Sequence, residues 1–443
     1  MKDLTKGKPS VLILSFALPV FLANLLQLTY SIVDTRIVGT FLGENMLAAV
    51  GATTTLSNLI IGFLLGLSNG FAIVTAQKFG ARDIKAVKKS FAAALIMGVS
   101  IALIITAAGL IFLSPILKFL NIPQDLSGEA SAYISVIIAG LIATFLYDMC
   151  AAVLRAIGDT ITPLIILAVS VMLNVAGDIF FVVILKEGVR GAAIATVLAQ
   201  FIAFVVCAVY MFRKYDILRL TKQDFKGIKG GMFKNMLGGG LSMGFMSSLV
   251  NIGSLTLQTA INKLGQDIIV AHTAARKISE IFMIMFTVFG QTMATYCGQN
   301  IGAGEVERVK KGIKLSIFYT CIWCTLAMIA SYTIGDRLVH LVTGSSNYVV
   351  IKNATDYLKF DSIFYYVTAV ICIVRNAMQG LGEHITPLVS SSLEMIGKII
   401  IAATLVPVMG YTGVILAEPI VWFIMVIPLL IKIYRMPVLK ENY

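Results

Sequence analysis

The chain has 443 residues, of which 58% are hydrophobic and 13% are charged, and its mean hydropathy is +0.90. Soluble globular proteins contain about 25% charged residues, so this composition excludes that class and indicates an integral membrane protein. The formal net charge of +12 would suit a nucleic-acid-binding protein, but the basic residues gather in alternate connections between apolar runs, as expected of cytoplasmic loops. We therefore expect a multi-pass protein of the plasma (inner) membrane, in contact with the lipid bilayer, with both termini cytoplasmic and no nucleic-acid partner.

Roughly twelve apolar runs follow one another along the chain, each close to the ~20 residues that a spanning helix needs. Continuous runs of this length favour helices, because the strands of a membrane barrel alternate in polarity over about ten residues. The predicted spans are 11–38, 46–77, 90–117, 129–155, 161–185 and 191–212 in the first half, and 236–263, 268–298, 312–335, 349–378, 387–407 and 411–433 in the second.

Two segments of the first half recur in the second half, about 222 residues later. The segment Gln77–Ala81 returns as Gln299–Ala303, and Ile161–Leu164 returns as Ile385–Leu388. Each half contains an even number of predicted spans, so both copies enter the membrane in the same orientation. The sequence therefore predicts an all-α integral membrane protein with twelve transmembrane helices, arranged as two six-helix lobes related by a parallel repeat.

The polar segment between the sixth and seventh spans is the one connection long enough to join two lobes. We predict an N-terminal lobe over 1–212, a cytoplasmic linker over 213–235 and a C-terminal lobe over 236–443. The connections after the second and eighth spans contain glycine and end in the acids Asp83 and Glu305. We expect each acid to cap the helix that follows it.

Four polar residues of the first half fall at a similar depth inside predicted spans. An ionisable side chain there costs about 2.5–3.5 kcal/mol, so Asp34 and Asp178 each need a reason. Asn174 lies one helical turn before Asp178, and Thr196 begins a span at about the same level. Their oxygen atoms could bind a small cation such as Na⁺, or the two carboxylates could share a proton, because like charges do not ionise together cheaply. The alternative is that both acids only form hydrogen bonds between packed helices.

The second half carries its own ionisable residues inside predicted spans: Arg276, Lys277, Glu280, Asp361, Glu394 and Lys398. Arg276 and Glu280, like Glu394 and Lys398, are four residues apart and can pair on one helix face. By the repeat, Lys398 takes the place of Asn174. A cation there would stand in for a bound ion and lock the second lobe while the first one titrates. The alternatives are that these charges line a substrate cavity, or that they pair only to hold the helix register.

With these residues in place, the sequence resembles the multidrug and toxin extrusion (MATE) transporters. The resemblance covers essentially the whole chain and is closest to the branch typified by the bacterial DNA-damage-inducible (DinF-like) transporters. Its most specific part is the first lobe, which has Pro19 and Asp34 in the first span, the Asn174/Asp178 pair in the fifth and Thr196 in the sixth. The resemblance implies that Asp34, Asn174, Asp178 and Thr196 bind the coupling cation, which is H⁺ or Na⁺.

Three further residues acquire expected roles from this resemblance. Pro19 has no N–H to donate and can bend the first span. Tyr133 falls where the branch has a tyrosine near the cation cluster, and Asp148 falls where relatives carry an asparagine, which changes the local charge.

The sequence thus predicts secondary active efflux of small, cationic or amphipathic organic compounds, in antiport with H⁺ or Na⁺, by alternating access of two lobes. We expect a monomer that is not an enzyme and that uses no cofactor besides the coupling ion. The three histidines are scattered, and the sequence contains no evident nucleophile constellation. Two alternatives stay open, namely a flippase for lipid-linked precursors and a membrane enzyme or receptor.

Overall fold

The structure of the protein is a computed structural model, which describes residues 2–120, 122–344 and 346–440. Helices account for nearly all of this part of the chain. Their bounds in the first half are α1 (Pro9–Leu42), α2 (Glu44–Gly80), α3 (Ile84–Ile111), α4 (Leu113–Phe119), α5 (Gln124–Ala139), α6 (Leu141–Ala156), α7 (Ile161–Asp178), the π-helix η1 (Ile179–Ile184), α8 (Gly188–Lys214) and the 3₁₀ turn η2 (Asp216–Leu218). The remaining helices are α9 (Gly230–Ile261), α10 (Gln266–Gly302), α11 (Val306–Thr343), α12 (Tyr348–Ile363), α13 (Tyr365–Gly380), α14 (Ile385–Met409), α15 (Tyr411–Arg435) and the 3₁₀ turn η3 (Pro437–Leu439).

Within the described residues, 10 helices are long and apolar enough to cross a membrane, and the number rises to 12 when each of two bent helix pairs counts as one span. The predicted all-α fold with repeated halves is therefore confirmed. The two bent pairs are α5 with α6, at 45°, and α12 with α13, at 54°. Neither bend was predicted, because the apolar runs continue through both breaks.

The chain divides into two compact units, which do not coincide with the predicted lobes. The first unit contains the residues up to Leu4 and Leu18–Gly244, and the second contains Thr5–Ala17 and Phe245–Tyr443. The division therefore runs through α1 and α9 rather than through the polar segment 213–235.

Specific interactions explain where the polar segment and the N-terminal segment belong. The Lys89 ammonium donates a 3.0 Å hydrogen bond to the Gly227 carbonyl, and Leu218 is fully buried, so the segment 213–235 packs on the first unit. In the second unit, the Arg308 guanidinium donates a 2.9 Å hydrogen bond to the Gly7 carbonyl. The polarity of 213–235 predicted a cytoplasmic linker but could not indicate that a single apolar residue, Leu218, is buried against the first unit.

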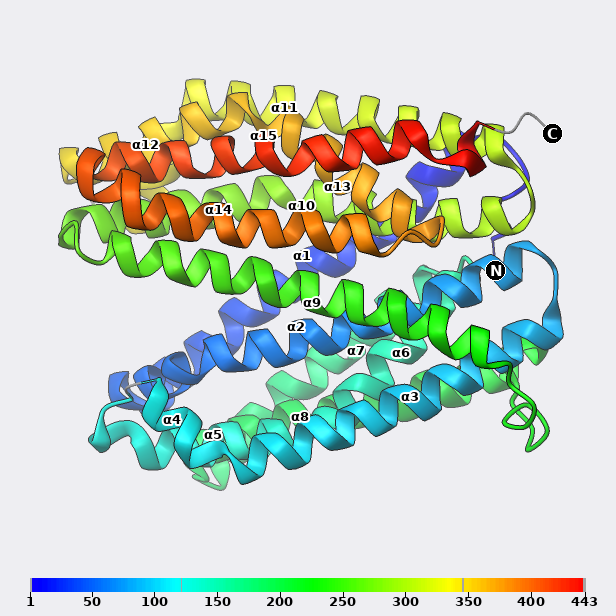
Figure 1. Cartoon of the computed structure of the whole chain (residues 1–443). Helices are drawn as coiled ribbons and strands as arrows, with labels where there is room; N and C mark the ends of the chain where they lie inside the picture. Colours follow the sequence, from blue (N-terminus) through cyan, green and yellow to red (C-terminus); the bar gives the residue numbers. More distant parts are fainter. Residues whose placement is uncertain (1, 121, 345, 441–443) are drawn as a thin grey trace. The chain divides into compact units, whose positions relative to one another are not determined.

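The first unit is built around a core formed by α2, α3, α5, α6 and α8, which pack on one another. Fully buried aromatic and aliphatic side chains fill it, including Phe71, Phe91, Ile134 and Phe145. Helix α7 packs along α8, and both helices are labelled in Figure 1. This pairing of α7 with α8 brings their polar residues together inside the unit.

The second unit repeats the pattern with α10 to α15. Helix α14 lies along α15, and α10 packs on α11, α12 and α13 (Figure 1). Its core contains Phe286, Tyr357, Tyr365 and Trp422, all nearly inaccessible to solvent. The pairs α7·α8 and α14·α15 occupy equivalent places in the two halves of the repeat.

The two repeated connections behave differently from each other. Helix α2 ends at Gly80, Arg82 adopts a left-handed conformation with φ 57°, and the Asp83 side chain then caps α3 by accepting a 2.9 Å hydrogen bond from the Ala86 N–H. The capping prediction is therefore confirmed for Asp83. It is wrong for Glu305, whose side chain makes no capping hydrogen bond to α11. Directly before a helix, the shorter side chains of Asp, Asn, Ser and Thr are the ones that reach the first-turn N–H groups.

Candidate functional site

The four polar residues of the first half come together inside the first unit. Asp34 lies on α1, Asn174 and Asp178 lie on α7, and Thr196 lies on α8. Apolar contacts hold the end of α1 in place, because the fully buried Val38 packs with Val182 of η1 and Ala192 of α8.

The Asn174 amide is the centre of this cluster. In the orientation that satisfies both ends of the amide, its oxygen accepts a 3.0 Å hydrogen bond from the Thr196 N–H. Its nitrogen donates to the Tyr30 hydroxyl and to the Asp178 Oδ2, each at 3.2 Å. Asn174 is only 2% exposed. The amide therefore links three helices and fixes the position of the Asp178 carboxyl.

The carboxyls of Asp34 and Asp178 lie close enough for the charge of each to act on the other. Asp178 is fully buried, and Asp34 is partly buried. In the described part of the chain, no lysine or arginine forms an ion pair with either acid. A close carboxyl pair without a neighbouring cationic side chain needs a shared proton or a bound cation, because two buried like charges repel strongly.

Two tyrosines complete the cluster. Tyr133 of α5 lies near both acids. Tyr30 of α1 was not predicted, and its hydroxyl lies 3.5 Å from the Thr196 Oγ1. The signal for Tyr30 is its spacing, since it precedes Asp34 by one helical turn and therefore shares its face.

Asp148 belongs to a different polar group. It lies on α6 beside Arg155, whose charge acts on it. Arg155 in turn donates a 3.2 Å hydrogen bond to the Asn69 Oδ1 on α2. Asp148 is therefore influenced by Arg155 of its own helix and not by the Asp34–Asp178 pair.

Pro19 lies inside α1, next to the point where this helix passes from the second unit to the first. The unit boundary falls between Ala17 and Leu18. Proline cannot donate the hydrogen bond that a helix interior needs, so it weakens α1 where the helix changes unit.

The buried charges of the second unit form an ion-pair network. The Lys398 ammonium lies 2.9 Å from the Glu394 Oε1 and 3.1 Å from the Glu418 Oε1. Arg276 lies 3.4 Å from the same oxygen of Glu418. The network thus connects α10, α14 and α15, and it contains the Glu394–Lys398 pair that the sequence suggested.

The other suggested pair does not form. Arg276 points to the buried face of α10 and pairs with Glu418 of α15, whereas Lys277 and Glu280 are exposed on α10. Asp361 of α12 is fully buried close to the network and experiences the charges of Glu418 and Arg276. Arg276 therefore pairs with Glu418 of α15 and not with Glu280, because Glu280 faces away from the interior of the unit.

A cavity of about 220 Å³ opens beside this network. Apolar walls come from α10, α13 and α15, and include Phe286 and Trp422. Its polar lining consists of Ser254, Arg276, Thr287, Thr368, Arg375, Glu394, Lys398 and Glu418. Three of the predicted cavity charges, Arg276, Glu394 and Lys398, therefore face an internal space.

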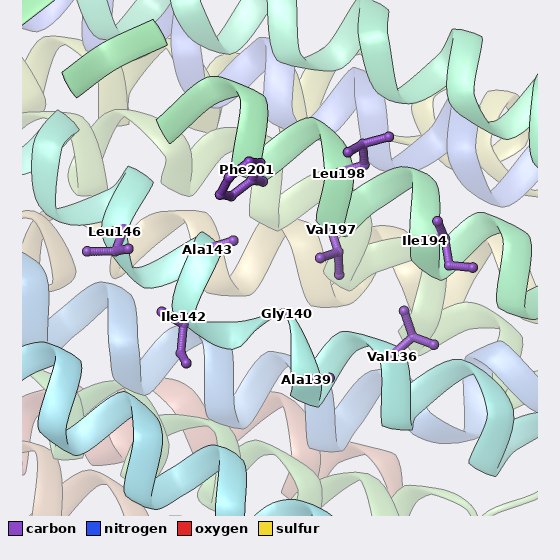
Figure 2. Close-up of a pocket in the computed structure, with 10 residues that line it drawn as sticks. All are labelled: Val136, Ala139, Gly140, Ile142, Ala143, Leu146, Ile194, Val197, Leu198 and Phe201. Carbon is purple, nitrogen blue, oxygen red and sulfur yellow. The ribbon is translucent and has the colours of Figure 1, made fainter. Parts of the chain in front are cut away.

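A second, purely apolar groove of about 430 Å³ lies at the bend between α5 and α6. Figure 2 shows Gly140 at the break, with Val197, Leu198 and Phe201 of α8 opposite. Phe201 is 50% exposed, as expected of a side chain that faces lipid in a membrane protein. This groove offers no polar group to orient a solute.

A metal site made of classical ligands is not evident. Within residues 2–120, 122–344 and 346–440, no group of three or more His, Cys, Asp or Glu side chains is arranged to bind a metal ion. A cation at the α1–α7–α8 cluster would instead use mixed carboxyl, amide and hydroxyl oxygens, which are ligands that hard cations accept.

Comparisons with known proteins agree with this architecture. A sequence model of the MatE family matches residues 19–180 and 243–404, one match in each half. The chain is 25% identical over 391 residues to the "Probable multidrug resistance protein YpnP" of Bacillus subtilis (strain 168), covering 87% of this chain and 86% of that protein. It is 26% identical over 404 residues to the "Probable multidrug resistance protein YoeA" of the same organism, covering 88% and 86%.

Among solved structures, the chain is similar to the "Outward-facing conformation of a multidrug resistance MATE family transporter of the MOP superfamily". The TM-score is 0.91 at 22% identity, with 99% of this chain and 98% of that chain covered. At this identity the likeness concerns the fold.

Proposed function

The chain belongs to the MatE family, and we propose that it exports small cationic or amphipathic organic compounds from the cytoplasm in exchange for H⁺ or Na⁺. The relatives YpnP and YoeA are both named probable multidrug resistance proteins, which supports the export of small organic compounds. The two repeated lobes would alternate access to a substrate, as repeat-built transporters do. We further propose a monomer in the plasma membrane with both termini cytoplasmic.

The observation that carries the coupling proposal is the buried Asp34–Asp178 pair beside Asn174 and Thr196. At an effective dielectric constant of about 20, two like charges about 4 Å apart repel by about 4 kcal/mol. Removing the shared proton or cation would therefore push α1 away from α7. Binding of a proton or cation between the two carboxyls would therefore hold α1 against α7, and its release would let α1 move away.

Pro19 provides a place where that movement of α1 can occur. The helix lacks one backbone hydrogen bond at the proline, so its two halves can change their relative direction at low cost. The half that carries Asp34 and Tyr30 belongs to the first unit. Loading and release of the coupling ion would then bend or straighten α1 near the unit boundary.

The energy available from the ion gradient is sufficient for this cycle. A membrane potential of about 100 mV supplies about 2.3 kcal/mol for each charge that crosses. One ion exchanged for an uncharged compound thus supports a useful substrate gradient, since about 1.4 kcal/mol corresponds to a tenfold concentration ratio. Exchange of one ion for a monovalent cation moves no net charge, so a second coupling ion or the concentration gradient of the ion supplies the energy in that case.

The test is transport of a fluorescent organic cation in proteoliposomes, with proton and sodium gradients imposed separately. We expect one gradient to drive transport in the wild type, and we expect Asp34→Asn to lose that dependence. The exposed Asp125 at the start of α5 supplies the control Asp125→Asn, which should transport normally. Absence of gradient-driven transport across a panel of such cations would contradict the proposal.

A further inference from the structure

The repeat places the second-unit ion pair at the position of the first-unit cluster. When Ile161–Leu164 is aligned with its second copy, Ile385–Leu388, Asn174 corresponds to Lys398. In the next helix pair, the glycines Gly188 and Gly191 recur as Gly410 and Gly413. With that spacing, Thr196 of α8 corresponds to Glu418 of α15.

The equivalent side chains also make equivalent contacts. The Asn174 amide lies 3.2 Å from the Thr196 Oγ1 between α7 and α8. The Lys398 ammonium lies 3.1 Å from the Glu418 Oε1 between α14 and α15. The two helix pairs therefore use the same contact point, which is neutral in the first unit and ionic in the second.

The Lys398 ammonium is surrounded by oxygen atoms like a bound cation. It lies 2.9 Å from the Glu394 Oε1, 3.1 Å from the Glu418 Oε1 and 3.4 Å from the Ser254 Oγ. An ammonium has three N–H donors, so these oxygens from α14, α15 and α9 use all of them. Lys398 is only 2% exposed, so protein oxygen atoms rather than water surround its positive charge.

The two clusters differ in what balances their carboxyls. The Asp34–Asp178 pair has no cationic side chain in an ion pair with it among the described residues. In the second unit, Lys398 supplies a positive charge to both Glu394 and Glu418. The other charges around Lys398 are Arg276, which shares Glu418, together with the nearby Asp361 and Arg375.

We propose that the Lys398 ammonium is a built-in cation, which occupies the second-unit counterpart of the first-unit cation site. The second unit then needs no exchangeable ion, and coupling is restricted to the first unit; that restriction rests on the function proposed above. Truncation of Lys398 creates a site for a small monovalent cation, either an alkali metal ion or a short alkylammonium, at Glu394, Glu418 and Ser254. The adjoining cavity of about 220 Å³ gives such a cation room beside the carboxylates.

Arg276 does not remove the need for this cation. It lies 3.4 Å from the Glu418 Oε1 and can still neutralise that residue when Lys398 is absent. Glu394 is 6% exposed and has Lys398 as its ion-pair partner in the described part of the chain. The carboxylate of Glu394 is therefore the group that recruits an external cation.

The experiment measures thermal unfolding of the purified full-length protein in detergent. The parent is the Asp34→Asn/Asp178→Asn variant, which has no first-unit carboxyl pair, and Lys398→Ala and Lys398→Arg are added to it. Each protein is heated in equal concentrations of NaCl, ethylammonium chloride and choline chloride. We expect Lys398→Ala to unfold at a lower temperature in choline and its unfolding temperature to be raised specifically by Na⁺ or ethylammonium.

The parent and Lys398→Arg should show no such specific rise, because each retains a resident cation. A Lys398→Ala protein that can be purified only with Na⁺ or ethylammonium also supports the proposal. The proposal is overturned if Lys398→Ala responds equally to all three salts, or if it is lost in every salt while Lys398→Ala/Glu394→Gln is recovered. Because the first-unit acids are absent throughout, failure here is independent of the Asp34→Asn transport test.

Discussion

The Tyr215 hydroxyl donates a 2.6 Å hydrogen bond to the Asp159 Oδ2 and so ties the end of α8 to the start of α7. Asp159 also accepts from the Thr162 N–H at 3.1 Å and from its hydroxyl at 2.7 Å. In the second unit, Glu383 accepts from the Thr386 N–H at 3.1 Å. The acid that precedes each copy of the repeated Ile-Thr-Pro-Leu segment is therefore a helix cap.

The Asp159 cap predicts that the stability of the protein depends on pH. Burial raises the pKa of Asp159, but the hydrogen bonds from Tyr215 and Thr162 outweigh it and hold the pKa below the usual value. A carboxyl with a lowered folded pKa stabilises the protein above its unfolded pKa of about 3.9, and this contribution is lost as the pH falls through the lower folded value. Thermal unfolding in detergent between pH 7 and pH 3 should show a smaller loss for Asp159→Asn than for the wild type.

The same contact gives a stability prediction at neutral pH. Tyr215→Phe removes a donor to a charged group, which costs about 1.5–3 kcal/mol. Tyr434→Phe is the matched control, because Tyr434 is 81% exposed. Equal unfolding midpoints for the two variants would contradict the view that the hydroxyl ties α8 to α7.

Glu418 should be the most sensitive acid of the second unit. It forms ion pairs with both Lys398 and Arg276, so Glu418→Gln leaves the buried Lys398 and the partly buried Arg276 without their shared partner. Breaking a buried ion pair costs about 3–5 kcal/mol. Glu280→Gln on the exposed face of α10 should change stability by less than about 0.5 kcal/mol. Denaturant or thermal unfolding in detergent distinguishes these values, and a small effect of Glu418→Gln would mean that the network does not stabilise the fold.

The bend between α5 and α6 predicts a steric effect at Gly140. A Cβ added there would lie 2.3 Å from the Val197 Cγ2 on α8. Gly140→Ala should therefore cost about 1–3 kcal/mol, and Gly140→Ala/Val197→Ala should recover part of the loss. Gly128→Ala on α5 meets nothing within 4 Å and should gain up to about 1 kcal/mol. Equal unfolding midpoints for the two single alanine variants would show that α8 adjusts freely.

Particular residues show what could be predicted from the sequence. The spans follow from continuous apolar runs, and the depth of Asp34, Asn174 and Asp178 follows from their places within those runs. The pairing of Arg276 with Glu418 joins residues separated by 142 positions. A sequence pattern reports neighbours on one helix, so it suggested Glu280 and could not indicate a partner on α15.

The helix bends were missed for a related reason. Gly140 and Phe364 lie within apolar segments that are long enough to be straight spans. The bend at Gly140 is marked by close contact with Val197, which depends on how α8 packs. Packing of this kind is decided by the tertiary fold and not by local propensity.

Tyr30 provides the final prediction, because it joins the cation cluster without carrying a charge. Its hydroxyl lies 3.5 Å from the Thr196 Oγ1 and 3.2 Å from the Asn174 amide nitrogen. Tyr30→Phe keeps the ring but removes these contacts, and one neutral hydrogen bond contributes about 1 kcal/mol, or about fivefold in an equilibrium constant. We expect the half-saturating concentration of the coupling ion in the proteoliposome assay to rise about fivefold, with the maximal rate little changed.

Tyr332→Phe is the control for this measurement, since Tyr332 on α11 is 50% exposed and lies in the second unit. Asp34→Asn should abolish the ion dependence, whereas Tyr30→Phe should only shift it, because the carboxyls rather than the hydroxyl carry the ion. An unchanged half-saturating concentration in Tyr30→Phe would remove Tyr30 from the site. Complete loss of ion dependence in Tyr30→Phe would instead mean that the hydroxyl is an essential ligand, and the fivefold expectation would then be wrong.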